Sequence, residues 1–272
     1  MTLTQLINGR PEDQISASDR GLFYGDGLFE TVRVQQGHLC LWSLHLQRLR
    51  SGCERLGIAV PDSTLLEHEA VSLLCGEDLE VIKIIVTRGV GQRGFAVTGT
   101  ESPTRIVMHQ KFPRYKSDFW RSGIRMRFCR TRLAIQPALA GLKHLNCLQQ
   151  VLARREWDDP EIQEGIMLNN DNEVVEGCMS NIFLVKNNRI MTPDLSLCGV
   201  AGVMRHHILK LAQDLGIELD ITSVTPQDLR DAEEIFVSNS LIGVWPVRQL
   251  EQHLYTVGPI TQEIMERLQY FR

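Results

Sequence analysis

Lys143, in the stretch AGLKHLN at residues 140–146, is the side chain whose surroundings most favour chemistry. Leu145, Leu148 and Leu152 follow it at helical spacing, so we expect it at the start of an amphipathic helix. There its charge would oppose the helix dipole, and partial loss of water would lower its pKa. A neutral lysine amine is a nucleophile that forms Schiff bases with carbonyl compounds. The simpler alternative is a solvated lysine near a helix start.

A Schiff base with an aldehyde cofactor such as pyridoxal phosphate needs two further groups: an anion site for the phosphate and a partner for the pyridine nitrogen. Glu176, at a strand end in NEVVEGCMSNIF, is a candidate for the second. The glycine-bounded loop 198–205 and the small polar stretch 237–243 offer backbone N–H groups, and Arg48 offers a fixed positive charge. Taken singly, each of these features is better explained by an ordinary structural role: a solvated glutamate, a helix cap, a turn or a surface arginine.

A glycine pattern further upstream does not indicate a nucleotide site. Gly89, Gly91 and Gly94 spell G-x-G-x-x-G after a strand-like run, but β-prone and turn residues follow where a dinucleotide fingerprint needs a helix. We therefore expect a glycine-rich hairpin loop. Arg93 within it is a candidate for binding a substrate carboxylate, and a solvated loop arginine is the alternative.

Signatures of other chemistry are missing from the sequence. It contains no G-x-S-x-G elbow, no P-loop lysine, no HExxH and no paired-cysteine zinc pattern. His206 and His207 are consecutive, so on a helix they would point about 100° apart and make a poor pair of metal ligands. We expect no metal site.

Composition excludes several classes of partner. The 272 residues carry a net charge of −4 without long runs of one sign, which argues against nucleic-acid binding. No stretch approaches the roughly 18 apolar residues of a spanning helix, and the N-terminus lacks the apolar core of a signal peptide, so we expect no membrane partner. The seven cysteines form no CxxC pair and indicate reduced thiols in a cytoplasmic protein.

The pattern of strands and helices predicts an α+β (mixed α/β) chain of two domains with much antiparallel sheet. Residues 111–120 contain a proline, mixed charges and no periodicity, so we take them as the interdomain loop. The small N-terminal domain is then 1–110, and the larger C-terminal, cofactor-binding domain is 121–272.

Taken together and in order, these features resemble the fold type IV pyridoxal-phosphate enzymes, which include branched-chain and D-amino-acid aminotransferases and aminodeoxychorismate lyases. The resemblance covers nearly the whole chain. It rests on SDRGLFYGDGLFETVRV (18–34), HLQRL (45–49), TRGVGQRGF (87–95), GLKHLNCLQQVLARRE (141–156), EVVEGCMSNIFLV (173–185), GVAGVMR (199–205) and VSNSLIGVWPV (237–247).

The resemblance implies individual roles. Lys143 would hold pyridoxal 5'-phosphate, Glu176 would bind its pyridine nitrogen and Arg48 its phosphate. Further phosphate contacts would come from the backbone amides and turn of Val200, Ala201, Ser240 and Leu241. Ala201 stands where the family often has Thr, Ser or Asn, which removes one side-chain contact.

Within the family, KHLNCLQQVLAR and RGVGQRGF are most similar to aminodeoxychorismate lyase. This implies a lyase of folate biosynthesis that converts 4-amino-4-deoxychorismate to 4-aminobenzoate and pyruvate. Lys143 would exchange its Schiff base with the substrate, remove the hydrogen on the carbon bearing nitrogen, and allow elimination. A D-amino-acid or branched-chain aminotransferase is the alternative, because it shares every step up to the carbanion. A binding protein without cofactor is a third hypothesis.

The resemblance also implies a setting for the substrate. We expect a pocket between the domains, walled by Phe29, Thr31, Arg93 and the interdomain loop. Members of the family resemble one another in being homodimers whose sites take a loop from the neighbouring subunit, so we expect this chain to form a homodimer.

Overall fold

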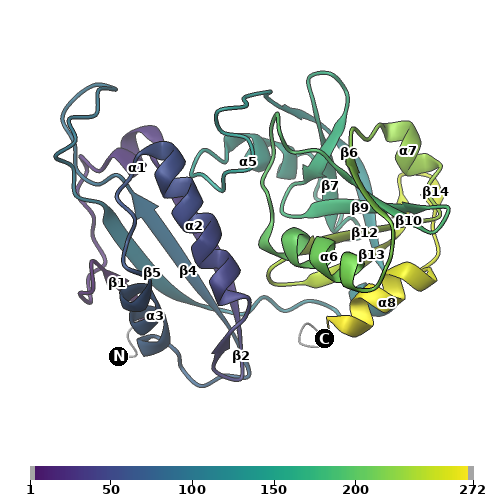
Figure 1. Ribbon diagram of the computed structural model, residues 1–272, viewed down its shortest axis with the longest axis horizontal. Helices are drawn as coiled ribbons and strands as arrows, with labels where there is room; N and C mark the ends of the chain where they lie inside the picture. The colour runs from purple at the N-terminus through teal and green to yellow at the C-terminus, as the bar shows by residue number, and fades with distance from the viewer. Residues whose placement is uncertain (1–3, 269–272) are drawn as a thin grey trace. The chain divides into compact units, whose positions relative to one another are not determined.

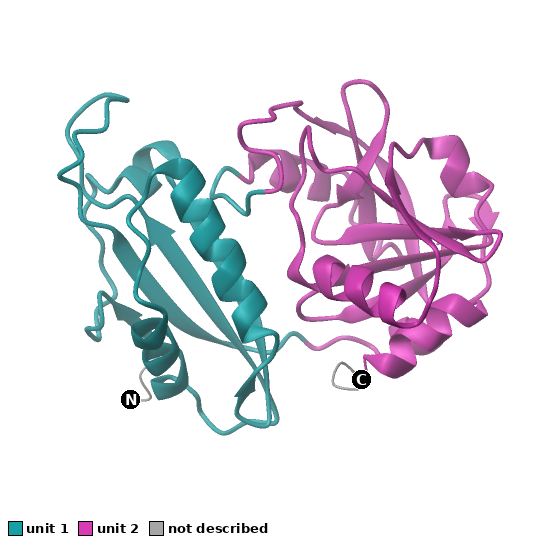
Figure 2. Ribbon diagram, in the orientation of Figure 1, with its two compact units in different colours: residues 1–113, 142–146 teal, residues 114–141, 147–272 magenta. Residues whose placement is uncertain are grey.

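A computed structural model describes residues 4–268, which divide into two compact units (Figure 2). The first unit, teal in Figure 2, comprises residues 1–113 and 142–146. The second, in magenta, comprises residues 114–141 and 147–272. Among the helices of the described range, none is long and apolar enough to cross a membrane.

The first unit is a sheet with helices on one face (Figure 1). Its elements are β1 (Gln5–Ile7), α1 (Arg20–Tyr24), β2 (Gly27–Gln35), β3 (His38–Leu39), α2 (Trp42–Leu56), α3 (Ser63–Ser72), β4 (Leu79–Thr87) and β5 (Thr104–Lys111). Within the described residues the sheet has five strands in the order β1-β5-β4-β2-β3, and all neighbours are antiparallel.

The side chains of strand β2 alternate between the two faces of this sheet. Leu28, Glu30 and Val32 alternate along it and are buried, whereas Phe29 and Thr31 between them are only partly buried. The buried face meets α2 so closely that a Cβ added at Gly52 would lie 2.7 Å from a methyl carbon of Leu28. The two faces therefore present different side chains: Leu28 and Glu30 under α2, and Phe29 and Thr31 opposite.

The second unit is built on a larger mixed sheet. Its elements are α4 (Asp118–Arg121), β6 (Ile124–Leu133), α5 (Leu148–Arg154), β7 (Glu164–Asn169), β8 (Val174–Gly177), β9 (Asn181–Lys186), β10 (Arg189–Pro193), α6 (Val203–Asp214), β11 (Leu219–Thr222), α7 (Pro226–Arg230), β12 (Glu234–Asn239), β13 (Gly243–Leu250), β14 (His253–Leu254) and α8 (Pro259–Arg267). Within the described residues the strand order is β11-β10-β9-β12-β13-β6-β7-β8, and β14 pairs with β13.

Trp245 lies at the centre of an aromatic cluster in the second unit. It is 1% exposed, and the rings of Tyr115, Phe119 and Trp120 meet it edge-on with centroids 4.9, 5.2 and 5.6 Å away. Edge-to-face contacts of this kind stabilise a core beyond the burial of area alone. The segment predicted as an interdomain loop at 111–120 thus contributes rings to this core, and it also contains the last residue of β5 and most of α4.

Two predictions require correction in this region of the chain. The segment Leu142–Asn146, predicted within the second domain, groups with the first unit. The helix expected from Lys143 begins only at Leu148, and the apolar side chains predicted as its buried stripe face water: Leu148 is 75% exposed. Pairing of the preceding residues with a strand overrides the helical period there.

Candidate active site

Lys143 lies in an extended segment that runs along β2. The N–H of Phe29 donates to the carbonyl oxygen of Lys143 at 3.0 Å, and the N–H of Leu145 donates to the carbonyl of Gly27 at 3.1 Å. These bonds bring the Lys143 Nζ to 4.1 Å from the centroid of the Phe29 ring. Because α5 starts at Leu148, the helix-dipole reason for a perturbed Lys143 is wrong, and the amine is instead held on an aromatic face.

The residue two positions before Lys143 is tied to the loop predicted to bind phosphate. The N–H of Gly141 donates to the carbonyl of Gly199 at 2.8 Å, and the N–H of Ala201 donates to the carbonyl of Gly141 at 3.1 Å. Between them, the N–H of Val200 donates to Oε2 of Glu176 at 2.8 Å. One hydrogen-bonded group in the second unit therefore contains Glu176, the 199–201 loop and Gly141, which lies two positions before Lys143.

Burial distinguishes Glu176 from a solvated hairpin glutamate. It is 4% exposed, at the end of β8, and the small residues after it belong to a crowded turn. A Cβ added at Gly177 would lie 2.4 Å from the Ser180 hydroxyl, and one at Gly199 would lie 3.4 Å from Oε2 of Glu176. A side chain at Gly177 would displace the Ser180 hydroxyl, and one at Gly199 would displace the Val175 side chain, a methyl carbon of which would lie 2.7 Å from the added Cβ.

The predicted phosphate amides already have acceptors. Val200 and Ala201 donate as described above, and the N–H of Leu241 donates to Oδ1 of Asn239 at 2.9 Å. The start of α6 offers other donors, because its N-cap, Gly202, provides no side-chain cap. In the same region the hydroxyl of Ser238 is buried without a hydrogen-bond partner among the described residues, two positions before the predicted contact Ser240.

Arg48 belongs to a buried ionic group that the sequence reasoning did not identify. Its Nε and Nη2 contact the two carboxylate oxygens of Glu30 at 2.8 and 2.5 Å, and Nδ1 of His45 lies 2.6 Å from Oε2 of the same carboxylate. Burial alone would raise the pKa of Glu30, but the Arg48 charge and hydrogen bond, with a smaller effect of His45, hold it at about 2. The carboxylate is therefore ionised.

His45 connects this group electrostatically to Lys143. Burial is the main cause that lowers the pKa of His45. The hydrogen bond and charge of Glu30 oppose it, and the charges of Arg48 and, to the smallest extent, Lys143 lower the pKa further. With Nδ1 turned to Glu30, the buried Nε2 has no hydrogen-bond partner among residues 4–268. His45 is thus a neutral imidazole whose Nε2 is available, and the charge of Lys143 affects its pKa.

A signal for Glu30 was present in the sequence. In LFETVRV, Leu28, Glu30 and Val32 share one face of a strand, and a carboxylate among buried apolar side chains needs a cationic partner. The i, i+3 pair His45 and Arg48 in HLQRL supplies such partners on one helix face. Joining the two required knowing that α2 packs on β2.

The exposed face of β2 carries the predicted substrate residues beside positive charges. Phe29 and Thr31 lie on this face, and Thr31 is paired in register with Lys83 of β4. The Lys83 Nζ lies 5.3 Å from the centroid of the Phe29 ring, so Lys83 and Lys143 both contact this ring. Phe29, Thr31 and two cations therefore form a surface suited to an anionic ligand.

Arg93 lies apart from this group of contacts. It is exposed and, within residues 4–268, makes no hydrogen bond or ion pair. The backbone after it is held by Arg20, whose guanidinium donates to the carbonyls of Gly94 and Phe95 at 3.0 and 3.2 Å. As predicted, no helix follows the glycines, so the loop does not form a dinucleotide fingerprint. The buried Arg20 side chain thus fixes the backbone next to the exposed Arg93.

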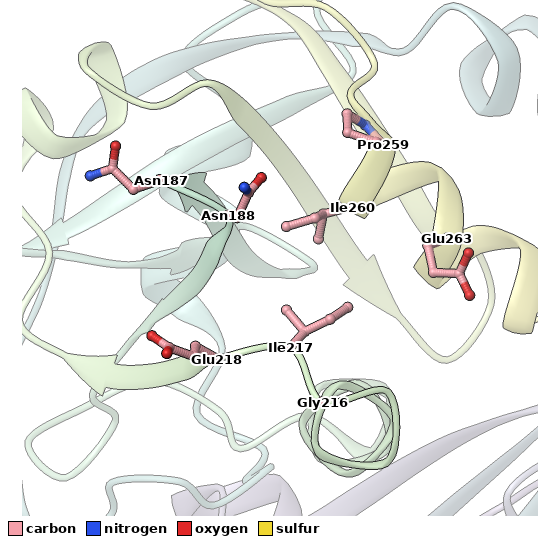
Figure 3. Close-up of a pocket in the computed structure, with 8 residues that line it drawn as sticks. All are labelled: Asn187, Asn188, Gly216, Ile217, Glu218, Pro259, Ile260 and Glu263. Carbon is pink, nitrogen blue, oxygen red and sulfur yellow. The ribbon is translucent and has the colours of Figure 1, made fainter.

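A surface pocket on the second unit is unrelated to these residues (Figure 3). It is lined by Asn187, Asn188, Gly216, Ile217, Glu218, Pro259, Ile260 and Glu263. None of the predicted site residues borders it, and its lining contains neither a cation nor a nucleophile. This pocket therefore lacks the side chains that Schiff-base chemistry requires.

Residues 27–250 match the family model described as Amino-transferase class IV. The chain belongs to this family. The match takes in β2, Lys143, Glu176 and the 199–201 loop, and it confirms the predicted fold type IV architecture.

Relatives of this aminotransferase class IV chain include enzymes with both of the predicted activities. An aminodeoxychorismate lyase from Vibrio harveyi is 36% identical over 96% of this chain and 98% of its own. The crystal structure of 4-amino-4-deoxychorismate lyase from Pseudomonas aeruginosa is similar with a TM-score of 0.93 and 46% identity, over 97% of this chain and 98% of that one. A putative branched-chain-amino-acid aminotransferase from Methanocaldococcus jannaschii is 30% identical over 98% and 95%.

Proposed function

We propose that this chain is an aminodeoxychorismate lyase, which converts 4-amino-4-deoxychorismate to 4-aminobenzoate and pyruvate. The observation that carries the proposal concerns the segment that contains Gly141 and Lys143. Lys143 holds its amine on the Phe29 ring, and Gly141 is bonded to the loop that contacts Glu176. A lysine amine and a buried carboxylate are two of the groups that pyridoxal phosphate requires.

The residues present fit pyridoxal phosphate. Lys143 offers the amine, the buried Glu176 carboxylate suits a protonated pyridine nitrogen, and Arg48 offers a guanidinium already oriented by Glu30. The uncapped first turn of α6 and the Ser238 hydroxyl, which lacks a partner within residues 4–268, add donors for a phosphate. Bound there, pyridoxal phosphate would supply an electron sink for negative charge on the carbon that bears the substrate nitrogen.

Lys143 carries the proton transfers in this proposal. With pyridoxal phosphate bound and the substrate in place, the Lys143 amine would act as the base that removes the proton from the carbon that bears nitrogen. The adjacent carbon–oxygen bond to the enolpyruvyl group then breaks, and the six-membered ring becomes aromatic. Lys143 returns its proton to the methylene carbon of the departing enolpyruvate, which becomes pyruvate. Glu176 would hold the pyridine nitrogen of the cofactor.

The lyase is favoured over the aminotransferase by the comparisons and by charge. Both lyase relatives are more similar to this chain than the putative branched-chain aminotransferase is. The face with Phe29 and Thr31 carries Lys83, a cation not used for proton transfer, and so suits a substrate with carboxylates better than one with an aliphatic side chain.

A product assay tests the activity. The purified protein, loaded with pyridoxal phosphate, is given 4-amino-4-deoxychorismate while pyruvate and 4-aminobenzoate are followed separately. Equal amounts of both products support the lyase. Amino-group transfer between an amino acid and a 2-oxo acid, with no release of 4-aminobenzoate, would instead establish an aminotransferase. Failure to take up any cofactor would exclude both.

We also infer that the chain forms a homodimer and works in the cytoplasm. Three large apolar side chains near the Arg93 loop face water: Leu22 is 63% exposed, Phe23 60% and Phe95 84%. A second copy of the chain would cover such a surface. Sedimentation of the full-length protein tests this, and a single species of 30.9 kDa would contradict it.

A further inference from the structure

A thiol, an imidazole and a carboxylate lie in a row in the first unit, outside the proposed active site. Cys75 follows α3, Glu80 is in β4 and His109 is in β5. The Cys75 Sγ is 3.8 Å from Nδ1 of His109, and Nε2 of the same ring is 2.7 Å from Oε2 of Glu80. A nucleophile, a base and a group that orients the base, in this order, are the parts of an activated nucleophile.

Glu80 and Cys75, at the two ends of this row, differ in how deeply they are buried. Glu80 is 1% exposed, and its carboxylate accepts the N–H groups of Cys75 at 2.8 Å and Gly76 at 3.2 Å. The His109 side chain is 10% exposed, whereas Cys75 is exposed. The carboxylate thus anchors both the ring and the backbone that carries the thiol, and leaves the sulfur accessible to reagents.

The contact with Glu80 determines which nitrogen of His109 can act as a base. The two atoms are close, but Oε2 is off the line of the N–H bond, so the contact is electrostatic rather than an aligned hydrogen bond. A carboxylate beside Nε2 favours the tautomer with its proton there, which leaves the Nδ1 lone pair facing the Cys75 thiol. The thiol hydrogen has a second acceptor, the Leu73 carbonyl, at 3.7 Å.

A metal site explains this arrangement less well than proton transfer does. The donor atoms of the three side chains lie within 4.8 Å of one another. However, the imidazole turns one nitrogen to the carboxylate and the other to the thiol, whereas one metal ion would need a single nitrogen facing both ligands.

Four of the six other cysteines are poorly suited to compete with Cys75. All seven lie within residues 4–268, and Cys75 is the exposed one. Burial raises the pKa of Cys53 and of Cys198, each to about 11, and it also raises the pKa of Cys40. A hydrogen bond with Cys129, followed by burial, raises the pKa of Cys178. These four thiols therefore remain protonated near neutral pH and react slowly.

We propose that Cys75 is a modification site, where its thiol exchanges with low-molecular-weight disulfides while His109 acts as base and Glu80 positions that base. Sγ transfers its proton to Nδ1 of His109 and bonds to one sulfur of the disulfide. The bond between the two reagent sulfurs breaks, and the departing thiolate takes the proton from His109. The Cys75 sulfur is oxidised and the departing sulfur is reduced, so no further oxidant is needed. Exposed Glu77 and Asp78 in the following turn repel anionic disulfides, so uncharged and zwitterionic ones are favoured.

The test follows the reaction of the cofactor-loaded protein with dithiodipyridine, a neutral disulfide whose departing thione absorbs in the near ultraviolet. We expect one thiol per chain to react at least about tenfold faster than the rest, which is modest for general-base assistance. Cys75→Ser should remove this fast phase, and mass spectrometry should locate the adduct on Cys75. The anionic dithiobis(nitrobenzoate) should react more slowly at the same thiol. A fast phase that survives Cys75→Ser would overturn the assignment.

Variants of the base and its partner test the mechanism. His109→Ala should slow the fast phase about tenfold or more, and added imidazole should restore part of the rate, which a purely structural loss would not allow. Glu80→Gln should slow it less. His68→Ala, at an exposed histidine of α3, is the matched control and should change nothing. If His109→Ala unfolds, His109→Asn replaces it, with melting temperature as the check. An unchanged rate in a folded His109 variant would rule out the base.

Discussion

Arg48 and Glu30 form a two-point ion pair inside the first unit, with N–O distances of 2.8 and 2.5 Å. The Glu30 carboxylate also faces Nδ1 of His45, so it holds two side chains of α2 from a strand. The guanidinium proposed to bind phosphate is therefore oriented before any ligand arrives, which reduces the entropy lost on binding. The same pairing makes Glu30 important for stability.

Glu30→Gln should destabilise the protein. The substitution removes the charge that compensates a mostly buried guanidinium, and breaking such a pair typically costs about 3–5 kcal/mol. Denaturant unfolding of the two proteins at pH 7 measures the difference. Glu54→Gln, on the exposed side of the same helix, is the control and should have little effect. A loss of under about 1 kcal/mol in Glu30→Gln would show that the pair contributes little net stability.

The Glu30 ion pair also predicts acid sensitivity. The pKa of the Glu30 carboxyl falls from 4.5 to about 2 on folding. The stability that this carboxylate contributes is therefore complete above pH 4.5 and is lost as the pH falls through about 2. At 1.36 kcal/mol per pKa unit, the carboxylate contributes about 3 kcal/mol at neutral pH. Unfolding midpoints between pH 6 and pH 2 should converge for the wild type and Glu30→Gln at the acid end. Parallel curves would contradict the low pKa.

Lys143→Ala should abolish covalent attachment of pyridoxal phosphate. Without the amine, the visible absorbance of the lysine-bound cofactor should be absent and borohydride should fix no label on the chain. Lys83→Ala is the matched control, because Lys83 contacts the same Phe29 ring and yet is not proposed to bind the cofactor covalently. Colour retained in Lys143→Ala, or lost only in Lys83→Ala, would transfer the role to another amine.

Glu176→Gln should leave the fold intact and slow turnover. Glutamine retains an oxygen to accept the Val200 N–H, so the melting temperature should change little. Loss of the negative charge should lower kcat by about a hundredfold, a typical effect of removing one aligned electrostatic contact. Glu173→Gln, in the same hairpin but bonded to Ser223 and Asn169, is the control. Equal kcat values for the two variants would remove Glu176 from the proposed site.

Arg93→Gln should weaken substrate binding without affecting stability. The side chain is exposed and forms no hydrogen bond or ion pair within the described residues, so unfolding should be unchanged. Loss of one charge-assisted bond to a carboxylate should raise KM about ten- to hundredfold. Arg50→Gln, an exposed arginine of α2, is the control. If KM is the same in both variants, Arg93 is a solvated loop residue.

How far the sequence predicts this site depends on the range of each interaction. Lys143 was found, but partly for a wrong reason: the helical period of Leu145 and Leu148 indicated a helix start, whereas backbone pairing with β2 keeps the segment extended. The end of α2 at Gly57, in contrast, is a local feature of the sequence, because the glycine adopts the left-handed conformation (φ 63°) that ends the helix.

Long-range contacts were beyond the sequence pattern. Nothing local indicates that the Val200 amide would donate to Glu176, or that Gly141 would bond the same loop from both sides. The Glu30 and His45 contact likewise forms only when α2 packs on β2. Similarity to a family carries such information because related chains preserve the packing that creates it.

The chain passes from the second unit into the first and back again within the segment around Lys143, since Leu142–Asn146 groups with β2 while its flanking residues do not. The two halves are therefore not interchangeable modules. A gene fusion or recombination that cut between residues 113 and 114 would transfer Lys143 with the second half and leave behind β2, the strand with which it pairs.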